Sequence, residues 1–184
     1  KSKSIVLHDA DLQSVISSVR SGIFFNAGQV CSAMSRLLVH KSRYTEVKDA
    51  VVKMAESLLI GSGEEQADLT PVVSKAQQIS VMAMIEQAKK EGAKIITGGY
   101  IPDMPGYFVA PTIIEATPEM TIAQEEVFGP VLVVMPFDTD TEAVAIANGT
   151  DFGLVAGVFG EGLNHVFNVA QQLRGGQVFV NEWF

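Results

Sequence analysis

Short apolar runs recur along the chain with the length and continuity of buried strands. A continuous apolar run, without the alternation of a half-exposed strand, is typical of a sheet that is covered on both faces. The run over residues 131–137 is the clearest case and predicts a central strand. The expected strands are residues 4–8, 36–40, 94–97, 131–137, 153–160 and 177–181, with shorter extended pieces at 107–109 and 112–114.

The segments between these runs repeat apolar residues at helical spacing. In residues 12–25, for example, Val15, Val19 and Ile23 share one face. Ser74 with Gln77, and Thr139 with Glu142, have the spacing of a capping box. The expected helices are residues 12–25, a segment from Ser42 or Thr45 to Gly61, a segment from Ser74 to about Lys90, a segment from Thr139 to about Gly149, and residues 163–173.

The alternation of strands with amphipathic helices predicts the fold class. It indicates an α/β domain with three layers, αβα, around a largely parallel sheet. A length of 184 residues is enough for one domain with a sizeable core. Residues 1–184 are therefore expected to form a single domain.

Charge and composition exclude several classes of protein. The formal charge is -8 and the largest basic cluster is Lys89-Lys90, which argues against binding to nucleic acid or to an anionic membrane surface. No apolar stretch reaches the roughly 18 residues of a membrane span, and the first residues do not resemble a signal peptide. A single cysteine permits no internal disulfide, so a reducing compartment, the cytoplasm, is expected. The mean hydropathy of +0.25 indicates that the domain buries one face against another domain or subunit.

Cys31 is the one cysteine, and it lies between an expected helix and an expected strand. Gly28 permits a tight turn just before it, and the nearby Asn26 and Gln29 are polar. Such surroundings suit a nucleophile. A free cysteine is also often a small buried hydrophobe, so the residues alone leave both interpretations open.

The histidines suggest a rival enzyme. A pair of Cys31 and His165, with Asn164 beside it, would predict a cysteine hydrolase. All three histidines, however, lie at the ends of expected elements, where solvated histidines are common. One cysteine and scattered histidines predict no metal site.

Two longer motifs carry a resemblance to a known family. Residues 24–31, Phe-Phe-Asn-Ala-Gly-Gln-Val-Cys, resemble the nucleophile motif Phe-Phe-Asn-x-Gly-Gln-x-Cys of the NAD(P)-dependent aldehyde dehydrogenase superfamily. Residues 125–130, Glu-Glu-Val-Phe-Gly-Pro, resemble a second signature of the same family, in the expected order. Met34 departs from the pattern, because the family usually has a small residue there.

The resemblance implies a role for each of several residues. Cys31 would be the catalytic nucleophile, and its backbone N–H would be one oxyanion donor. In the cofactor site, Glu126 would accept hydrogen bonds from the nicotinamide ribose, Phe128 would pack near the nicotinamide, and Gln77 would approach the ribose. The residues expected to line the substrate tunnel are Phe25, Val30 and Ser32. The implied cofactor is NAD or NADP, and the implied substrate is a small aldehyde.

The same resemblance implies a longer enzyme. The family's general base lies in a Glu-Leu-Gly-Gly motif that would directly precede Lys1, and its dinucleotide-binding domain lies further upstream. An oligomerisation strand would follow Trp183-Phe184. We therefore expect a catalytic domain that is inactive alone and belongs to a homo-oligomer. The alternative is a non-catalytic domain that contributes only folding and subunit contacts.

Overall fold

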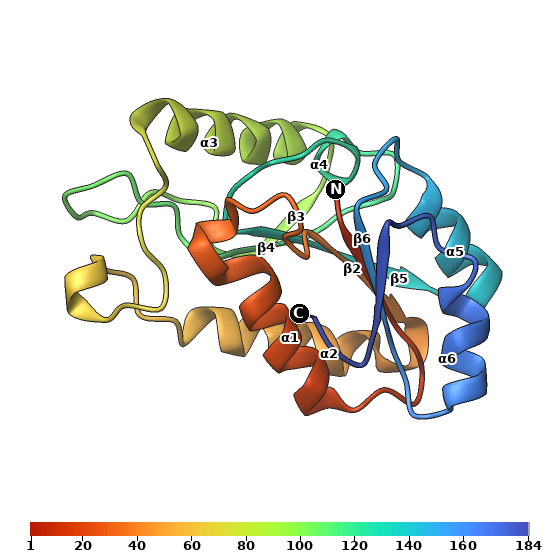
Figure 1. Cartoon of the computed structure of the whole chain (residues 1–184). Helices are drawn as coiled ribbons and strands as arrows, with labels where there is room; N and C mark the ends of the chain where they lie inside the picture. The colour runs from red at the N-terminus through yellow and green to blue at the C-terminus, as the bar shows by residue number, and fades with distance from the viewer. Residues whose placement is uncertain (184) are drawn as a thin grey trace.

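A computed structural model describes residues 1–183, so Phe184, the last residue of the Trp183-Phe184 end, lies outside the described residues. One mixed sheet forms the centre of the molecule (Figure 1). Its strands are β1 (Lys3–Val6), β2 (Arg36–His40), β3 (Lys94–Thr97), β4 (Thr112–Glu115), β5 (Val131–Phe137), β6 (Val155–Phe159) and β7 (Gln177–Val180). They lie in the order β3-β4-β5-β2-β1-β6-β7, and all neighbours are parallel except β3 and β4.

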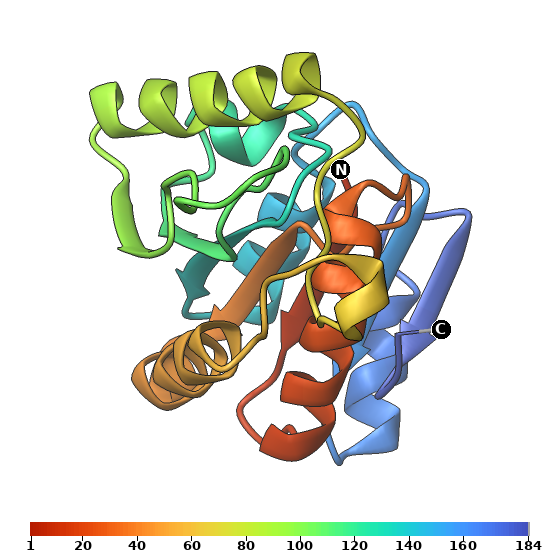
Figure 2. The same cartoon turned by 90° about the vertical axis from the view of Figure 1, so that its left-hand side faces the viewer.

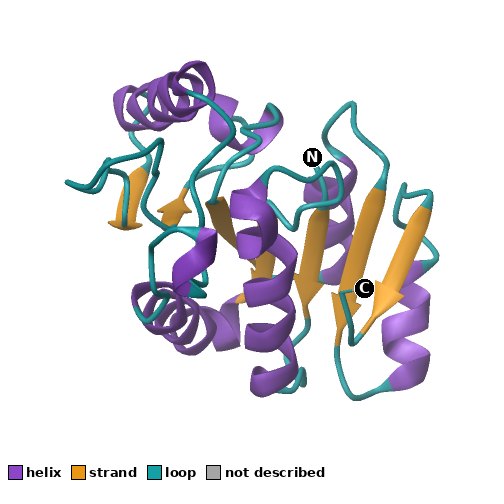
Figure 3. Ribbon diagram, turned by 60° about the vertical axis from the view of Figure 1, so that its left-hand side comes forward, coloured by secondary structure: helices purple, strands orange, loops and turns teal. Residues whose placement is uncertain are grey.

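Helices cover both faces of this sheet, which confirms the three-layer αβα prediction. One face carries α1 (Leu12–Phe24) and α2 (Tyr44–Glu56), packed against alternate strand residues such as Leu37 and Val134. The other face carries α3 (Lys75–Lys90), α4 (Thr121–Gln124), α5 (Asp140–Asn148) and α6 (Leu163–Ala170), packed against residues such as Leu38 and Val133. Figures 2 and 3 show α1 in front of the strands and α3 above them. Because neighbouring strand residues point to opposite faces, the continuous apolar runs serve both layers.

The structure corrects several expected boundaries. The expected helix toward Gly61 ends at Glu56, because the chain beyond it pairs with a later segment: Leu59 N–H donates to Asp68, and Ile60 bridges Leu69. The extended piece at 107–109 forms no strand, whereas the piece at 112–114 lies within β4. The last expected helix ends at Ala170 rather than at residue 173.

The two expected capping boxes form only by half. Ser74 and Thr139 each accept a hydrogen bond from the backbone N–H three residues on, as predicted. The reciprocal bonds are absent, because the Gln77 amide donates to the carbonyl groups of Val127 and Phe128 and Glu142 accepts from Asp138 N–H. Gln77 therefore serves a contact far away in the sequence.

Two buried cations attach helices to the centre of the sheet. Lys3 and Arg36 are neighbours in the register of β1 and β2, and both side chains are fully buried. Lys3 donates to the carbonyl of Arg174, beyond the end of α6, and Arg36 donates to the carbonyls of Ile146 and Ala147 in the last turn of α5. Cations suit these carbonyl-rich helix ends. Burial lowers the pKa of Lys3 to about 8 and the pKa of Arg36 to about 10.

Candidate functional site

The turn that leads to Cys31 has an uncommon backbone. Asn26, Ala27 and Gly28 have φ of 50°, 53° and 70°, in the left-handed region. For a residue other than glycine this conformation costs roughly 1–2 kcal/mol. Reciprocal side-chain bonds offset part of the cost: Asn26 Nδ2 donates to the Gln29 carbonyl, and Gln29 Nε2 donates to the Asn26 carbonyl, both at 3.1 Å. The turn ends at Cys31, which is exposed.

Gly28 brings the two sequence motifs into contact. A Cβ atom at Gly28 would lie 2.1 Å from the carbonyl oxygen of Gly129, so no side chain fits between the two backbones. On its other side, Gly129 packs against Val81 of α3. A Cβ atom at Gly129 would lie 2.6 Å from the Val81 side chain. The cavity left between the two loops is only about 10 Å³. The loop of Cys31 and the loop of Glu126 therefore form one packed unit.

The second loop presents Glu126 and Phe128 beside this contact. Glu126 is exposed, and its carboxylate accepts no hydrogen bond from residues 1–183. Phe128 has φ of 54°, and its ring is 38% exposed. Gln77 Nε2 donates to the Phe128 carbonyl at 2.8 Å, which fixes the loop against the first turn of α3. A carboxylate that accepts no hydrogen bond within residues 1–183, in one loop with an exposed aromatic ring, fits the hydroxyl groups and flat base of a nucleotide.

Both loops lie at the amino edge of the parallel strands. Cys31 precedes the first residue of β2 by five positions, and Glu126 precedes the first residue of β5 by the same number. Val30 and Ser32 flank Cys31 and are half-buried, in a turn closed by a bond from Ala33 N–H to the Val30 carbonyl. The backbone N–H of Cys31 donates to no acceptor within residues 1–183. This N–H is therefore open to a ligand.

Phe25 lines a different cavity from Val30, another of the expected tunnel residues. Its side chain is 66% exposed at the end of α1, where it lines a cavity of about 270 Å³ together with Arg20, Leu58 and Asp68. Neither Val30 nor Ser32 lines this cavity. The three residues are therefore close in sequence but do not share one enclosed space.

Met34, the departure from the family motif, is a core residue. Its side chain is fully buried and its backbone N–H donates to the Gly22 carbonyl at 2.8 Å. A Cβ at Gly22 would lie 2.9 Å from Met34 Cβ and 2.8 Å from the Trp183 ring. The absence of a side chain at Gly22 thus lets α1 approach the backbone of Met34 and the Trp183 ring closely.

Lys1 is a neighbour of the site that the sequence did not indicate, since a lysine before a short strand usually reads as solvated. Its side chain is buried, and Nζ has no hydrogen-bond partner within residues 1–183. Burial, with repulsion from Arg36, lowers the pKa of Lys1 to about 7, while attraction to Glu126 and Glu125 opposes the shift. The lysine thus places a titratable group behind the exposed glutamates.

His165 lies at the opposite edge, so the Cys31–His165 pair does not form. Its Nε2 is 2.6 Å from Asp140 Oδ2, and its ring contacts that of His8 at a centroid distance of 5.9 Å. His8 follows the end of β1, and His40 is the last residue of β2. A five-residue strand spans roughly 13 Å, which separates this edge from Cys31. The cysteine hydrolase alternative is wrong for that reason.

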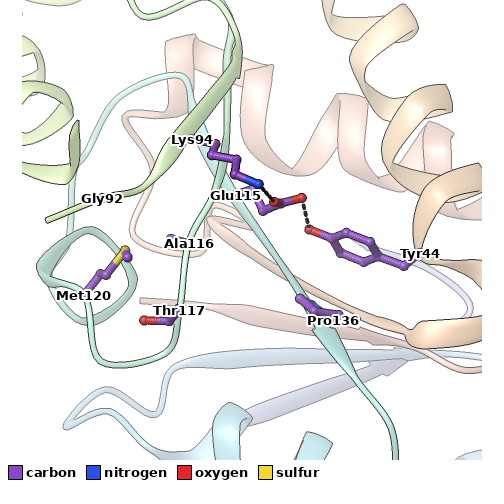
Figure 4. Close-up of a pocket in the computed structure, with 8 residues that line it drawn as sticks. All are labelled: Tyr44, Gly92, Lys94, Glu115, Ala116, Thr117, Met120 and Pro136. Carbon is purple, nitrogen blue, oxygen red and sulfur yellow. Dashed lines mark hydrogen bonds and ion pairs between the residues drawn. The ribbon is translucent and has the colours of Figure 1, made fainter.

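A larger cavity also lies at the carboxyl edge. It has a volume of about 300 Å³ between α2, α4 and the ends of β4 and β5 (Figure 4). Glu115 accepts a hydrogen bond from Tyr44 Oη at 2.9 Å and pairs with Lys48 and Lys94. Partial burial alone would raise the pKa of Glu115, but the bonds from Tyr44 and Lys48 bring it below its usual range. None of the motif residues lines this cavity.

Within residues 1–183, no group of three or more His, Cys, Asp or Glu side chains has a geometry that could hold a metal ion. No helix of that part of the chain has both the length and the apolar character needed to cross a membrane.

Comparison with known proteins gives the family directly. The model of the "Aldehyde dehydrogenase family" matches residues 1–184. The chain belongs to the aldehyde dehydrogenase family. This confirms the resemblance read from the two motifs.

Relatives within the aldehyde dehydrogenase family include enzymes with different substrates. Betaine aldehyde dehydrogenase of Sinorhizobium fredii is 43% identical over 100% of this chain, and aminoaldehyde dehydrogenase 1, peroxisomal, of Pisum sativum is 45% identical over 98%. This chain spans 39% and 37% of their lengths, respectively.

Solved structures of the family share the fold. An NAD+ complex of aldehyde dehydrogenase from Bacillus cereus superposes with a TM-score of 0.97 at 45% identity, covering 100% of this chain and 38% of that one. Betaine aldehyde dehydrogenase from Staphylococcus aureus in complex with NAD+ gives 0.97 at 35% identity, covering 100% of this chain and 37% of that one.

Proposed function

We propose that this chain is the catalytic domain of an NAD(P)-dependent aldehyde dehydrogenase, with Cys31 as its nucleophile. The observation that carries the proposal is the contact between Gly28 and Gly129, because it joins the loop of Cys31 to the loop of Glu126 at one exposed edge. Membership of the aldehyde dehydrogenase family supports the reaction type. The relatives act on different aldehydes, so the substrate proposed is a small aldehyde as a class.

The exposed thiol supplies the covalent chemistry. The Cys31 thiolate adds to the aldehyde carbonyl carbon, and the open N–H of Cys31 donates to the oxygen that becomes negative. Loss of hydride from this adduct leaves a thioester, which water cleaves to the carboxylate and the free thiol. One such oxyanion donor typically contributes about 3 kcal/mol to transition-state stabilisation. Val30, Ser32 and Phe25 are proposed to line the approach of the aldehyde.

NAD or NADP, when bound, supplies the hydride acceptor. The Glu126 carboxylate would accept hydrogen bonds from both ribose hydroxyl groups, for which its oxygens are suited because they accept no hydrogen bond from residues 1–183. Phe128 would pack against the nicotinamide, and Gln77 would lie beside the ribose. The NAD+ complexes of the related proteins support this choice of cofactor.

The rest of the reaction machinery is proposed to lie in a longer protein. The curated relatives are more than twice the length of this chain, which is consistent with an additional dinucleotide-binding domain and a general base outside these residues. Apolar side chains near the site support a covering domain, since Val73 is 81%, Phe25 66% and Ile79 58% exposed. Alone, the 184-residue chain is expected to lack turnover.

The longer protein is also proposed to be a homo-oligomer. β7 is the last strand in the order of the sheet and pairs only with β6 among the described strands, and its Val178 and Val180 are half-buried. An open strand edge is a template for pairing with a second chain. The mass in light scattering tests this: a monomer at tens of micromolar would contradict it.

The test of the proposed function is NADH or NADPH production from a panel of aldehydes by the full-length protein. Cys31→Ala is expected to reduce the rate to the protein-free background, because no other thiol in this chain can replace the nucleophile. Thermal unfolding of the variant within a few degrees of the parent protein serves as the folding control. The proposal fails if the variant keeps more than a few per cent of kcat, or if the 184-residue chain alone turns over the same aldehydes.

A further inference from the structure

Residues 73–77, which comprise the two residues before α3 and its first turn, lie between the two motif loops and are bonded to both. On one side, the backbone N–H of Val73 donates to Gln29 Oε1 at 2.8 Å. On the other side, Gln77 Nε2 donates to the carbonyl of Phe128 at 2.8 Å. The two attachment points, Val73 and Gln77, are thus only four positions apart, although the loops they hold lie about a hundred positions apart in the sequence.

Gln29 attaches the turn to the left-handed segment. Its Oε1 accepts a hydrogen bond from Val73 N–H, and its Nε2 donates one to the Asn26 carbonyl. One side chain therefore connects the residue before the α3 N-cap to the residues that carry the unfavourable φ angles. The peptide N–H of Gln29 also donates to the Asn26 carbonyl at 3.1 Å. The direction in which the chain reaches Cys31 therefore depends on where Val73 lies.

Gln77 attaches the turn to the glutamate loop in a similar way. The carbonyl it binds belongs to Phe128, which has a positive φ, and a longer contact of 3.4 Å reaches the carbonyl of Val127. Val81, one turn further along α3, packs on Gly129. The orientation of Glu126, immediately before Val127, therefore depends on α3.

The turn between these attachments is itself held firmly. Ser74 caps the helix by accepting from Gln77 N–H, and Gln78 is 1% exposed with its Nε2 2.6 Å from the Phe108 carbonyl. Lys75 Nζ donates to the side-chain oxygen of Gln78, Oε1, at 2.7 Å. Val72 N–H donates to the Tyr107 carbonyl at 3.0 Å. These bonds fix the residues to which both motif loops are attached, so they resist a displacement of either loop.

We propose that Gln29 and Gln77 are positioning residues that act as one unit through residues 73–77 at the start of α3, setting the place of Cys31 relative to Glu126. This rests on the proposed function for its catalytic meaning. In this proposal the Gln77 amide group holds the backbone of the Phe128 loop. Gln29 holds the residues before α3 and needs no contact with the substrate or the cofactor to act. The direct Gly28–Gly129 contact sets how closely the loops approach, and the turn sets their relative orientation.

A double-mutant cycle in the full-length protein tests the unit. Gln29→Met and Gln77→Met keep the length of each side chain and remove its hydrogen bonds, and Gln87→Met on the same helix removes only the exposed contact with Glu91. Two readouts are measured: the rate of Cys31 alkylation by iodoacetamide without cofactor, and kcat with KM for NAD. Alkylation needs neither aldehyde nor cofactor, so it reports on the unit even if the parent protein oxidises no aldehyde.

Each single change is expected to shift both readouts, although each residue touches only one loop. Gln77→Met should change the alkylation rate by about fivefold, the typical effect of one hydrogen bond, and Gln29→Met should raise KM for NAD by a similar factor. The double variant should fall short of the product of the single effects by about threefold or more. Gln87→Met should leave both readouts unchanged.

Gln29→Glu provides a second, milder variant. A carboxylate still accepts from Val73 N–H but cannot donate to Asn26, so KM for NAD should stay closer to the parent value than in Gln29→Met. The proposal is overturned if the effects of the two single changes multiply in the double variant, or if each change affects only the readout of its own loop. It is also overturned if Gln29→Glu and Gln29→Met raise KM for NAD by the same factor.

Discussion

The two edges of the sheet are held together by different kinds of contact. At the amino edge, the two motif loops meet through their backbones, Gly28 against Gly129, and the side chains of Gln29 and Gln77 that hold these loops bond to backbone groups. At the carboxyl edge, side chains meet side chains, as in the His165–Asp140 pair and the Tyr44–Glu115 bond. Where backbones make the contact, the functional groups of the side chains can bind a ligand. Where side chains bond to one another, those functional groups are already occupied.

This difference matters for locating a site by shape. The cavity of about 300 Å³ lies at the carboxyl edge, where ligands of open α/β sheets usually bind, whereas the space between the motif loops is about 10 Å³. Shape alone would therefore not locate the proposed site, since the cavity beside Phe25, of about 270 Å³, is similar in volume to the one at the carboxyl edge. The free thiol and the unengaged carboxylate point to the amino edge instead.

The largest expected effect comes from a matched pair of glycine substitutions, one at each edge. Both Gly28 and Gly92 have positive φ, of 70° and 93°, but a Cβ at Gly92 would meet nothing within 4 Å. Gly92→Ala should cost only the strain of about 1–2 kcal/mol in unfolding free energy. Gly28→Ala adds a clash with the Gly129 carbonyl and should lower kcat/KM by about 100-fold or more, because the two loops must separate. Steady-state kinetics of both variants measure the effect. An equal fall in kcat/KM in Gly28→Ala and Gly92→Ala would contradict the close packing of the two motif loops.

A smaller effect is expected at the carboxyl edge. Tyr44→Phe removes the hydrogen bond to Glu115 and should lower the unfolding free energy by about 1 kcal/mol at pH 7 without changing kcat. Tyr100→Phe, on an exposed ring, is the matched control. Chemical denaturation measures the stability, and a fall in kcat would place this cavity in the reaction.

The pH dependence of that difference has a definite sign. Because the folded-state pKa of Glu115 is lowered, its contribution to stability is present above the ordinary glutamate pKa and is lost as the pH falls through the folded value. Tyr44→Phe removes part of the cause of that shift. The gap between the parent protein and the variant should therefore narrow as the pH falls below about 4.

The sequence predicted the strands well where apolar runs are continuous, as at residues 131–137, because burial on both faces leaves a local signature. It could not predict that Lys3 and Arg36 are buried, since their partners are carbonyl groups more than a hundred residues away. The helix expected to reach Gly61 was too long for a different reason: the pairing of Ile60 with Leu69, nine residues later, overrides the helical pattern.

For the candidate site, the motifs identified which residues to compare but not how they meet. The glycines in both motifs were visible, yet the contact of Gly28 with Gly129 depends on the order of strands in the sheet. The bonds of Gln29 and Gln77 go to backbone groups, which leave no mark in the sequence. The roles of Cys31, Glu126 and Phe128 in catalysis and cofactor binding stay predictions.

The most direct test of a single site at the amino edge is the protection of Cys31 by cofactor. In the full-length protein, iodoacetamide labelling of Cys31 is followed with increasing NAD in the parent protein, in Glu126→Gln and in the neighbouring control Glu125→Gln. We expect NAD to slow labelling in the parent and in Glu125→Gln, and Glu126→Gln to need about tenfold more NAD, as the loss of a charge-assisted hydrogen bond predicts. Labelling that is insensitive to NAD, or equally sensitive in both variants, would contradict the account.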